Sequence, residues 1–168
     1  AAVSFNKRTL QGTSLVAPTS VQFGPDARLY VAQQSGTILA YDIDRSAQGT
    51  YSVDSAEVIN LVRNIPNHDD DGDLNSGVAN RLVTGILVTG TAQTPVLYVT
   101  SSDPRIGGGS DGTDENLDTN SAIISRLTWN GSSWAKLDLV RGLPRSEENH
   151  NANGLVLDEA AGILYVAY

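Results

Sequence analysis

The feature of this sequence that most limits its fold is a pair of short motifs that recur in the same order. The triplet Leu-Tyr-Val occurs at 29–31, 97–99 and 164–166, and Leu-Val-Arg-x-[Ile/Leu]-Pro occurs at 61–66 and 139–144. No segment shows a sustained helical period, so helix should be scarce. Repeated four-stranded units of this kind are typical of β-propeller blades. The alternative is a β-sandwich in which the tripeptides recur by coincidence.

Alternating apolar residues separated by turn residues predict the strands of each unit. They are expected at 3–10 as an initial strand, then at 20–23, 29–32, 37–43 and 58–62, at 85–88, 96–100, 122–129 and 134–140, and at 154–157 and 164–166. Asn130-Gly131 predicts a hairpin turn between the last two strands of the second unit. We therefore predict an all-β chain of antiparallel blades that forms the N-terminal part (1–168) of one β-propeller. The blade units are expected at about 18–66, 82–144 and, cut short, 150–168.

Composition narrows the class of protein. The net charge of −8 argues against nucleic acid as a partner, because nucleic acid requires basic surfaces. No apolar run reaches the length that spans a bilayer. Cysteine and methionine are both absent, so the chain has no disulfide, and we expect it to be processed or to belong to a longer polypeptide. The start Ala-Ala-Val is compatible with signal-peptide cleavage, which predicts a secreted, extracellular or periplasmic bacterial protein.

A loop of dense negative charge follows the first unit and has the spacing of a calcium-binding loop. Oxygen-bearing side chains alternate along it, with Gly72 at the place where such a loop turns sharply. The predicted ligands are Asn67, Asp69, Asp71 and Asp73. The bidentate glutamate that usually closes such a site is missing, because Val78 stands there. A solvated acidic loop is the alternative interpretation. The glycine-rich segment 107–114 is a weaker candidate of the same kind.

The segment 143–168 carries the main candidate for chemistry. Its phrase Asn-His-Asn-Ala-Asn-Gly-Leu-Val-Leu (149–157) and the phrase at 21–32 resemble the soluble quinoprotein glucose/sorbosone dehydrogenases, in a branch found in large secreted bacterial proteins. The resemblance implies a six-bladed propeller that binds pyrroloquinoline quinone (PQQ) and calcium and oxidises sugars. It makes His150 the general base and gives Arg145 and Asn149 a role in binding the cofactor. This chain has Asn-Gly-Leu (153–155) where the family has Gly-Arg-Leu.

Two alternatives remain open at the level of sequence. His68 also follows an asparagine, after the first copy of the Leu-Val-Arg-x-[Ile/Leu]-Pro motif. His150 is therefore either a catalytic base or a structural residue that recurs at the same turn of each unit. The chain is either an enzyme of the sugar dehydrogenase type or a non-catalytic propeller module of a large extracellular protein that binds glycan or protein. In both cases the incomplete third unit needs a partner surface for its apolar residues. We expect the remainder of the propeller to supply it, as a continuing polypeptide or a second chain.

Overall fold

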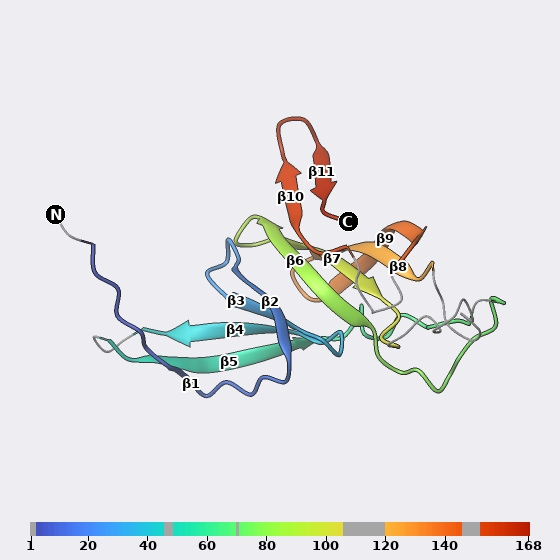
Figure 1. Ribbon diagram of the computed structural model, residues 1–168. Coiled ribbons are helices and arrows are strands. Elements are labelled where there is room, and N and C mark those ends of the chain that lie inside the picture. The colour runs from blue at the N-terminus through green and yellow to red at the C-terminus, as the bar shows by residue number, and fades with distance from the viewer. Residues whose placement is uncertain (1–2, 46–48, 70, 106–119, 146–151) are drawn as a thin grey trace.

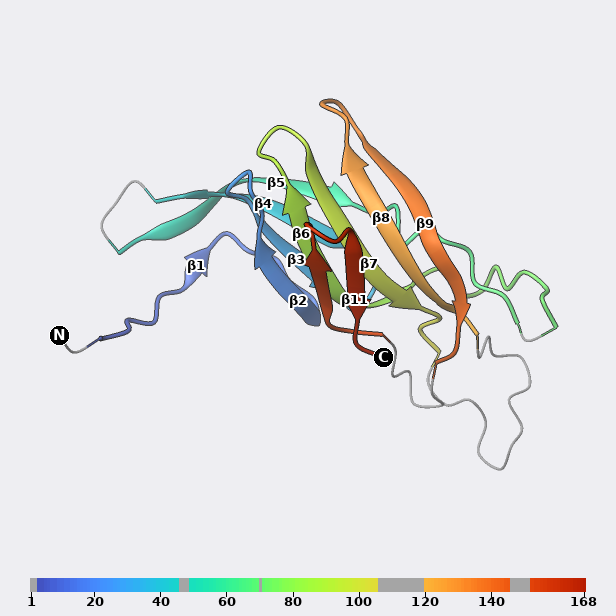
Figure 2. The same cartoon turned by 90° about the horizontal axis from the view of Figure 1, so that it is seen from above.

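The computed structural model describes residues 3–45, 49–69, 71–105, 120–145 and 152–168, and these form three sheets, antiparallel except for one short strand (Figure 1). No helix occurs among the described residues, so none of them provides a helical membrane span. The all-β prediction is confirmed. The sheets follow one another along the chain and curl like part of a barrel, which gives a propeller-like arrangement (Figure 2).

The first sheet contains the first predicted unit and one additional short strand. Its order is β1-β5-β4-β3-β2, and only the β1–β5 pair is parallel. The strands are β1 (Leu10–Gln11), β2 (Pro18–Phe23), β3 (Leu29–Gln33), β4 (Ile38–Asp44) and β5 (Tyr51–Ile59). The four antiparallel strands β2 to β5 of this sheet correspond to the predicted unit at 18–66.

The second and third sheets correspond to the second and third predicted units. They consist of β6 (Leu82–Gly90), β7 (Pro95–Ser102), β8 (Ala122–Trp129) and β9 (Trp134–Leu143), and of the hairpin β10 (Leu155–Asp158) and β11 (Ile163–Val166). The Asn130-Gly131 turn is confirmed: it connects the paired residues Trp129 and Trp134. The Asn130 Oδ1 accepts hydrogen bonds from the backbone N–H groups of Ser132 and Ser133 at 3.0 and 2.9 Å.

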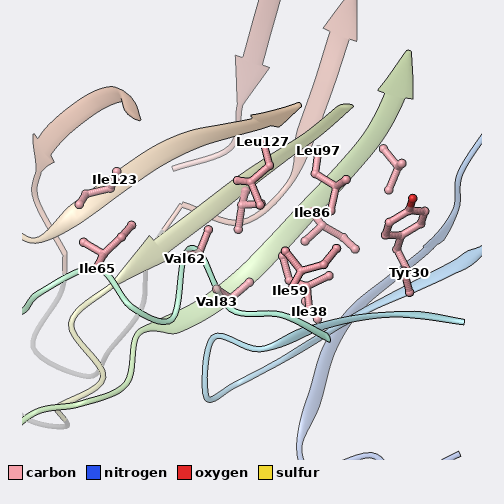
Figure 3. Close-up of a cluster of buried hydrophobic side chains, with 14 residues drawn as sticks. Tyr30, Ile38, Ile59, Val62, Ile65, Val83, Ile86, Leu97, Ile123 and Leu127 are labelled. Atoms are coloured by element: carbon pink, nitrogen blue, oxygen red, sulfur yellow. The ribbon is translucent and has the colours of Figure 1, made fainter. Parts of the chain in front are cut away.

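The main hydrophobic core lies between the first two sheets (Figure 3). Alternate residues of each strand point into it, because successive side chains of a strand face opposite sides of the sheet. Its fully buried members, with at most 1% of their surface exposed, are Tyr30, Ala32, Ile38, Ala40, Val62, Val83, Leu97, Val99 and Leu127. Each aliphatic side chain buried in this way contributes roughly 1.5–3 kcal/mol, so this interface dominates the stability of the pair of sheets.

The first strands of successive units lie next to one another, as the inner strands of propeller blades do. Between β2 and β6, the Gln22 carboxamide pairs with the backbone of Val88: its Nε2 donates to the carbonyl at 3.1 Å, and its Oε1 accepts from the N–H at 2.8 Å. Between β6 and the segment before β10, the Thr84 hydroxyl donates to the Ala152 carbonyl at 2.6 Å. The units are therefore joined in sequence order through their first strands.

A polar network also joins the first two sheets at the edge of their core. Arg28 donates to Glu57 Oε2 at 2.6 Å and to Asp26 Oδ2 at 2.7 Å. The Trp134 indole N–H donates to Glu57 Oε1 at 2.8 Å across the interface, and its ring meets Tyr30 edge-on with centroids 6.4 Å apart. Glu57 thus accepts one hydrogen bond from each sheet.

A second charged group stabilises the outer strand of the second sheet. Asp138 accepts hydrogen bonds from Lys136 at 2.6 Å, from Ser125 at 2.7 Å and from Arg141 at 2.7 Å. Burial alone would raise the pKa of this carboxyl, but the three donors outweigh it and bring the pKa down to about 2. Asp138 therefore remains ionised well into the acid range.

Two of the predicted strands were misplaced. The initial strand predicted at 3–10 is limited to β1, and the strand predicted at 58–62 is β5 at Tyr51–Ile59. The prediction missed most of β5 because its sequence, Tyr-Ser-Val-Asp-Ser-Ala-Glu-Val-Ile, mixes apolar residues with serine and acidic residues that are common in loops. The strand has this composition because much of it is exposed. The residues after it, 60–65, form a turn in which the N–H of Ile65 donates to the Val62 carbonyl at 3.0 Å.

Candidate functional site

The long connections between strands gather at one end of the sheets, which we call the loop end. It comprises the described residues of the connections 60–81, 103–121 and 144–154, and it appears at the right of Figure 2. Antiparallel order within each unit places the loop before its first strand and the loop between its second and third strands at the same end. The sequence placed its candidate ligands and its candidate base in these loops.

Arg105 connects the loop after β7 to the acidic loop after β5. Its guanidinium forms ion pairs with Asp103, at 2.7 Å, and with Asp69, and it donates to the His68 carbonyl at 2.6 Å. Asn75 donates a further hydrogen bond to Asp69 at 3.0 Å. The hydrogen bonds from Arg105 and Asn75 lower the pKa of the Asp69 carboxyl. The two loops are therefore fixed to each other by a charged group with defined geometry.

Asn67 and Arg81 form a buried pair beside this ion pair. The Asn67 side chain donates to the carbonyls of Val78 at 2.9 Å and Asn80 at 2.7 Å, and its Oδ1 accepts from Arg81 Nη1 at 2.8 Å. Arg81 also donates to the Ser121 carbonyl at 2.6 Å, so it reaches the second loop as well. Both residues are 1% exposed. Their role in the structure is to fix the two ends of the 67–81 loop.

Arg145 brings the third connection to the same place. It is 8% exposed, and its Nη1 donates to the Arg105 carbonyl at 2.7 Å. The described structure resumes at Ala152, whose carbonyl accepts a hydrogen bond from the Thr84 hydroxyl. The predicted base His150 and its neighbour Asn149 lie outside the described residues. What is established is that the chain on either side of them is attached to the second sheet.

The four predicted calcium ligands have different surroundings. Asn67 uses its carboxamide oxygen and both N–H groups in contacts with the protein, and Asp69 is paired with Arg105. Asp71 and Asp73 are exposed, and the Asp71 carboxylate accepts a hydrogen bond from the Asp73 N–H at 3.0 Å. Within the described ranges, no group of three acidic or histidine side chains is placed to hold a metal.

In this arrangement the four predicted ligands therefore cannot all coordinate one calcium ion. Asn67 would have to release its buried partners, and Asp69 would have to exchange a guanidinium for the ion. Both changes cost contacts with good geometry. The calcium site stays a prediction.

The described residues also do not form a complete site for PQQ. This cofactor carries three carboxylates, which require several cationic or hydrogen-bonding groups. Of the cations at the loop end, Arg105 is neutralised by two carboxylates, and Arg145 donates to a backbone carbonyl. The predicted role of Arg145 in binding the cofactor therefore stays a prediction, as does that of Asn149.

Sequence reasoning located the loops but missed the residues that join them. Arg81, Asp103 and Arg105 gave no recognised motif, since each is a single charged residue beside a strand end. The available signal was weak: Ser-Ser-Asp (101–103) places polar residues at the end of an apolar strand, and all three are fully buried. Buried polar residues require partners, and Asp103 finds them within its own connection: Arg105 pairs with its carboxylate, and the Ser121 hydroxyl accepts from its N–H at 3.0 Å.

Comparison with protein-family profiles, with curated proteins and with solved structures finds no match. The class of protein is therefore defined by the fold alone: an all-β, propeller-like chain whose successive units share a loop end.

Proposed function

We propose that the chain is part of a secreted β-propeller whose loop end binds a sugar or glycan. One observation carries this proposal: connections from successive units converge at one end and are joined there by Arg105 and Arg145. Loops that are held rigidly at one end of a scaffold are common positions for binding residues. The exposed carboxylates of Asp71 and Asp73, which one of these loops presents, suit the hydroxyl groups of a sugar, because each hydroxyl can donate a hydrogen bond to them.

Calorimetric titration of the purified chain with a panel of aldoses and oligosaccharides tests this proposal. Asp71 and Asp73 are exposed in the loop, so the double change of both residues to asparagine should weaken binding without affecting the fold. Asp54→Asn is the matched control, because Asp54 is an exposed aspartate on β5, outside the loop end. Equal binding by the double variant and the wild type, or no heat with any sugar tested, would refute a sugar site there.

Oxidation of the bound sugar is a second proposal, supported by the sequence resemblance and by the attachment of both flanks of 146–151 at the loop end. PQQ would accept the hydride, and His150 would take the hydroxyl proton, a role that suits a histidine near neutral pH. With PQQ and calcium supplied, His150→Ala should reduce dye-coupled turnover roughly 10²–10⁴-fold, whereas His68→Ala should not. Absence of turnover in the wild type with every aldose would leave the non-catalytic binding module.

The remainder of the propeller is the proposed partner. The β10–β11 hairpin exposes apolar side chains on one face, with Val156 at 64%, Tyr165 at 56% and Ile163 at 46% of their surface. A further blade, in the same polypeptide or in a second chain, would cover them. If residues 1–168 are monomeric and the β10–β11 amides are as protected from hydrogen exchange as those of β7, no such partner is needed.

A further inference from the structure

A groove of about 660 Å³ lies at the end of the first sheet opposite the loop end. Its walls come from three parts of the chain: the irregular segment before β1, the residues flanking the β2–β3 turn, and the residues flanking the β4–β5 turn. The residues that define it are Asn6, Arg8, Phe23, Leu29, Arg45 and Tyr51. The volume falls within the roughly 300–1,000 Å³ of typical small-molecule sites.

Two cations border this groove in a chain that is otherwise acidic. Neither Arg8 nor Arg45 forms an ion pair with any residue that the structure describes. The Arg45 guanidinium lies over the Phe23 ring, 5.1 Å from its centroid. This stacking leaves the N–H groups at the edge of the guanidinium available to an anion. The groove therefore combines two cationic donors with an aromatic and aliphatic floor.

The groove is formed by the chain itself and is not simply an uncovered sheet face. The segment between β1 and β2 returns along the first sheet from β5 to β2, as Figure 1 shows. Gly12 lies against Val53, and the N–H of Gln34 donates to the Ala17 carbonyl at 2.9 Å. The apolar residues Val31, Leu39 and Tyr41 on this side of the sheet are at most 8% exposed. The wall that carries Asn6 and Arg8 is attached to the sheet at its end, where Leu10 pairs with Tyr51.

We propose that this groove binds a small monocarboxylate with a flat apolar body, such as an aryl carboxylate. The carboxylate would accept hydrogen bonds from Arg8 and Arg45, which match its geometry. The apolar body would lie along Phe23, Leu29 and Tyr51. This site is independent of the sugar site proposed at the loop end.

A neighbouring acidic hollow explains why the ligand carries a single negative charge. This hollow is lined by Asp26, Asp42, Asp44 and Asp54, and it shares Ile43 with the groove. Asp26 is paired with Arg28, but the hollow as a whole is acidic and repels an added anion. A monocarboxylate held between two guanidiniums keeps a net attraction, whereas a phosphate or another polyanion is repelled more strongly. The groove therefore selects against polyanions.

The test is titration of the full chain with 2-naphthoate, followed by ¹H–¹⁵N spectra that include the arginine Nε–H signals. We expect saturable one-site binding with shifts at Arg8 and Arg45. Arg8→Gln and Arg45→Gln should each weaken binding about tenfold, which corresponds to about 1.4 kcal/mol. Arg141→Gln is the matched control, because Arg141 is an exposed arginine on β9 whose side chain is 57% exposed. Higher salt should also weaken binding, since the pairs are solvent-accessible.

Neutral 2-naphthalenemethanol and inorganic phosphate are the comparison ligands, and both should bind at least tenfold more weakly than 2-naphthoate. Equal binding of the alcohol would show a nonspecific apolar surface and overturn the proposal. Tighter binding of phosphate would overturn it as well, as would unchanged affinity in both arginine variants. Phe23→Leu gives a second check on the apolar wall: it should weaken 2-naphthoate binding while leaving the thermal midpoint near that of the wild type.

Discussion

Replacing Gly85 with alanine tests how the third unit attaches to the second. A Cβ atom at this position would lie 1.8 Å from the Asn153 carbonyl oxygen and 2.8 Å from its carbon. Gly85 does not have a positive φ, which would itself penalise alanine. The substitution therefore acts only through the steric clash of the added Cβ atom. Carbon and oxygen atoms in contact need more than 3 Å, and therefore the segment around Asn153 must move away from β6.

The cost of this movement can be estimated from the contacts that would be lost. The hydrogen bond from Thr84 to the Ala152 carbonyl is broken, which is worth about 0.5–1.5 kcal/mol. Forcing an extra methyl group into a packed site costs typically 1–3 kcal/mol. We expect Gly85→Ala to lower the free energy of unfolding by about 2–4 kcal/mol. The β10–β11 hairpin keeps its own hydrogen bonds, so it should detach as a unit.

Urea unfolding combined with hydrogen exchange measures both effects. Protection should fall at the β10 and β11 amides and remain at β3 and β7. Gly154→Ala is the matched control: its Cβ would meet only the Ala167 Cβ, at an ordinary 3.6 Å. Thr84→Val should lower the free energy of unfolding when made in the wild type. It should lower it little further in Gly85→Ala, because the same hydrogen bond is already lost there. Stability within 0.5 kcal/mol of the wild type and unchanged exchange in Gly85→Ala would refute the reasoning about the docking of the third unit.

Trp134→Phe should cost about 0.5–1.5 kcal/mol, because it removes the indole donor to the partly exposed carboxylate of Glu57; an unchanged free energy in urea unfolding would contradict this. The Asp138 pKa is lowered from 3.8 to about 2, so the carboxylate stabilises the fold above pH 4 and this contribution is lost as pH falls towards 2; Asp138→Asn should flatten that part of the stability profile. Val62→Thr should destabilise by about 1–3 kcal/mol, since it buries a hydroxyl, whereas Val140→Thr at the equivalent motif position should be nearly neutral in thermal denaturation. Calorimetric titration of chelator-treated protein with calcium tests the 67–73 loop: heat and a higher melting temperature are expected if the ion replaces the protein contacts, and neither would be seen if the guanidinium keeps its place.

The sequence predicted the second and third strands of the first two units well because those strands are buried on at least one face. Leu29–Gln33 and Pro95–Ser102 each contain a continuous apolar run of four residues, and Ala122–Trp129 begins with three apolar residues in a row. The outer strand β5 was missed in most of its length because it is largely exposed, and its serine and acidic residues match the composition of a loop. Strand β9 is also largely exposed but was predicted because its apolar residues alternate regularly, whereas the alternation in β5 breaks at Asp54, where its pairing with β4 shifts register.

The candidate site was predictable only in outline. Spacing in the sequence showed that Asn67 and the aspartates after it could meet one cation. It could not show that Arg105, far along the chain, already supplies a cation to Asp69, or that Arg81 occupies the Asn67 oxygen. A ligand pattern read along one loop omits the competing donors that tertiary structure brings from other loops.

The repeated motif Leu-Val-Arg-x-[Ile/Leu]-Pro also shows that local sequence does not determine conformation, because its two copies differ in structure. At 61–66 it forms a turn whose Val62 is 1% exposed and packs in the core between the first two sheets. At 139–144 the same residue types continue strand β9, and Val140 is 41% exposed. The difference follows from what each copy faces: the first packs in the core against the four-stranded second sheet, whereas the β10–β11 hairpin contacts the second sheet at β6 and leaves Val140 largely uncovered. Local sequence leaves both conformations accessible, and the apolar surface available for packing decides between them. The conformation of 139–144 should therefore respond to whatever covers the second sheet beside that hairpin.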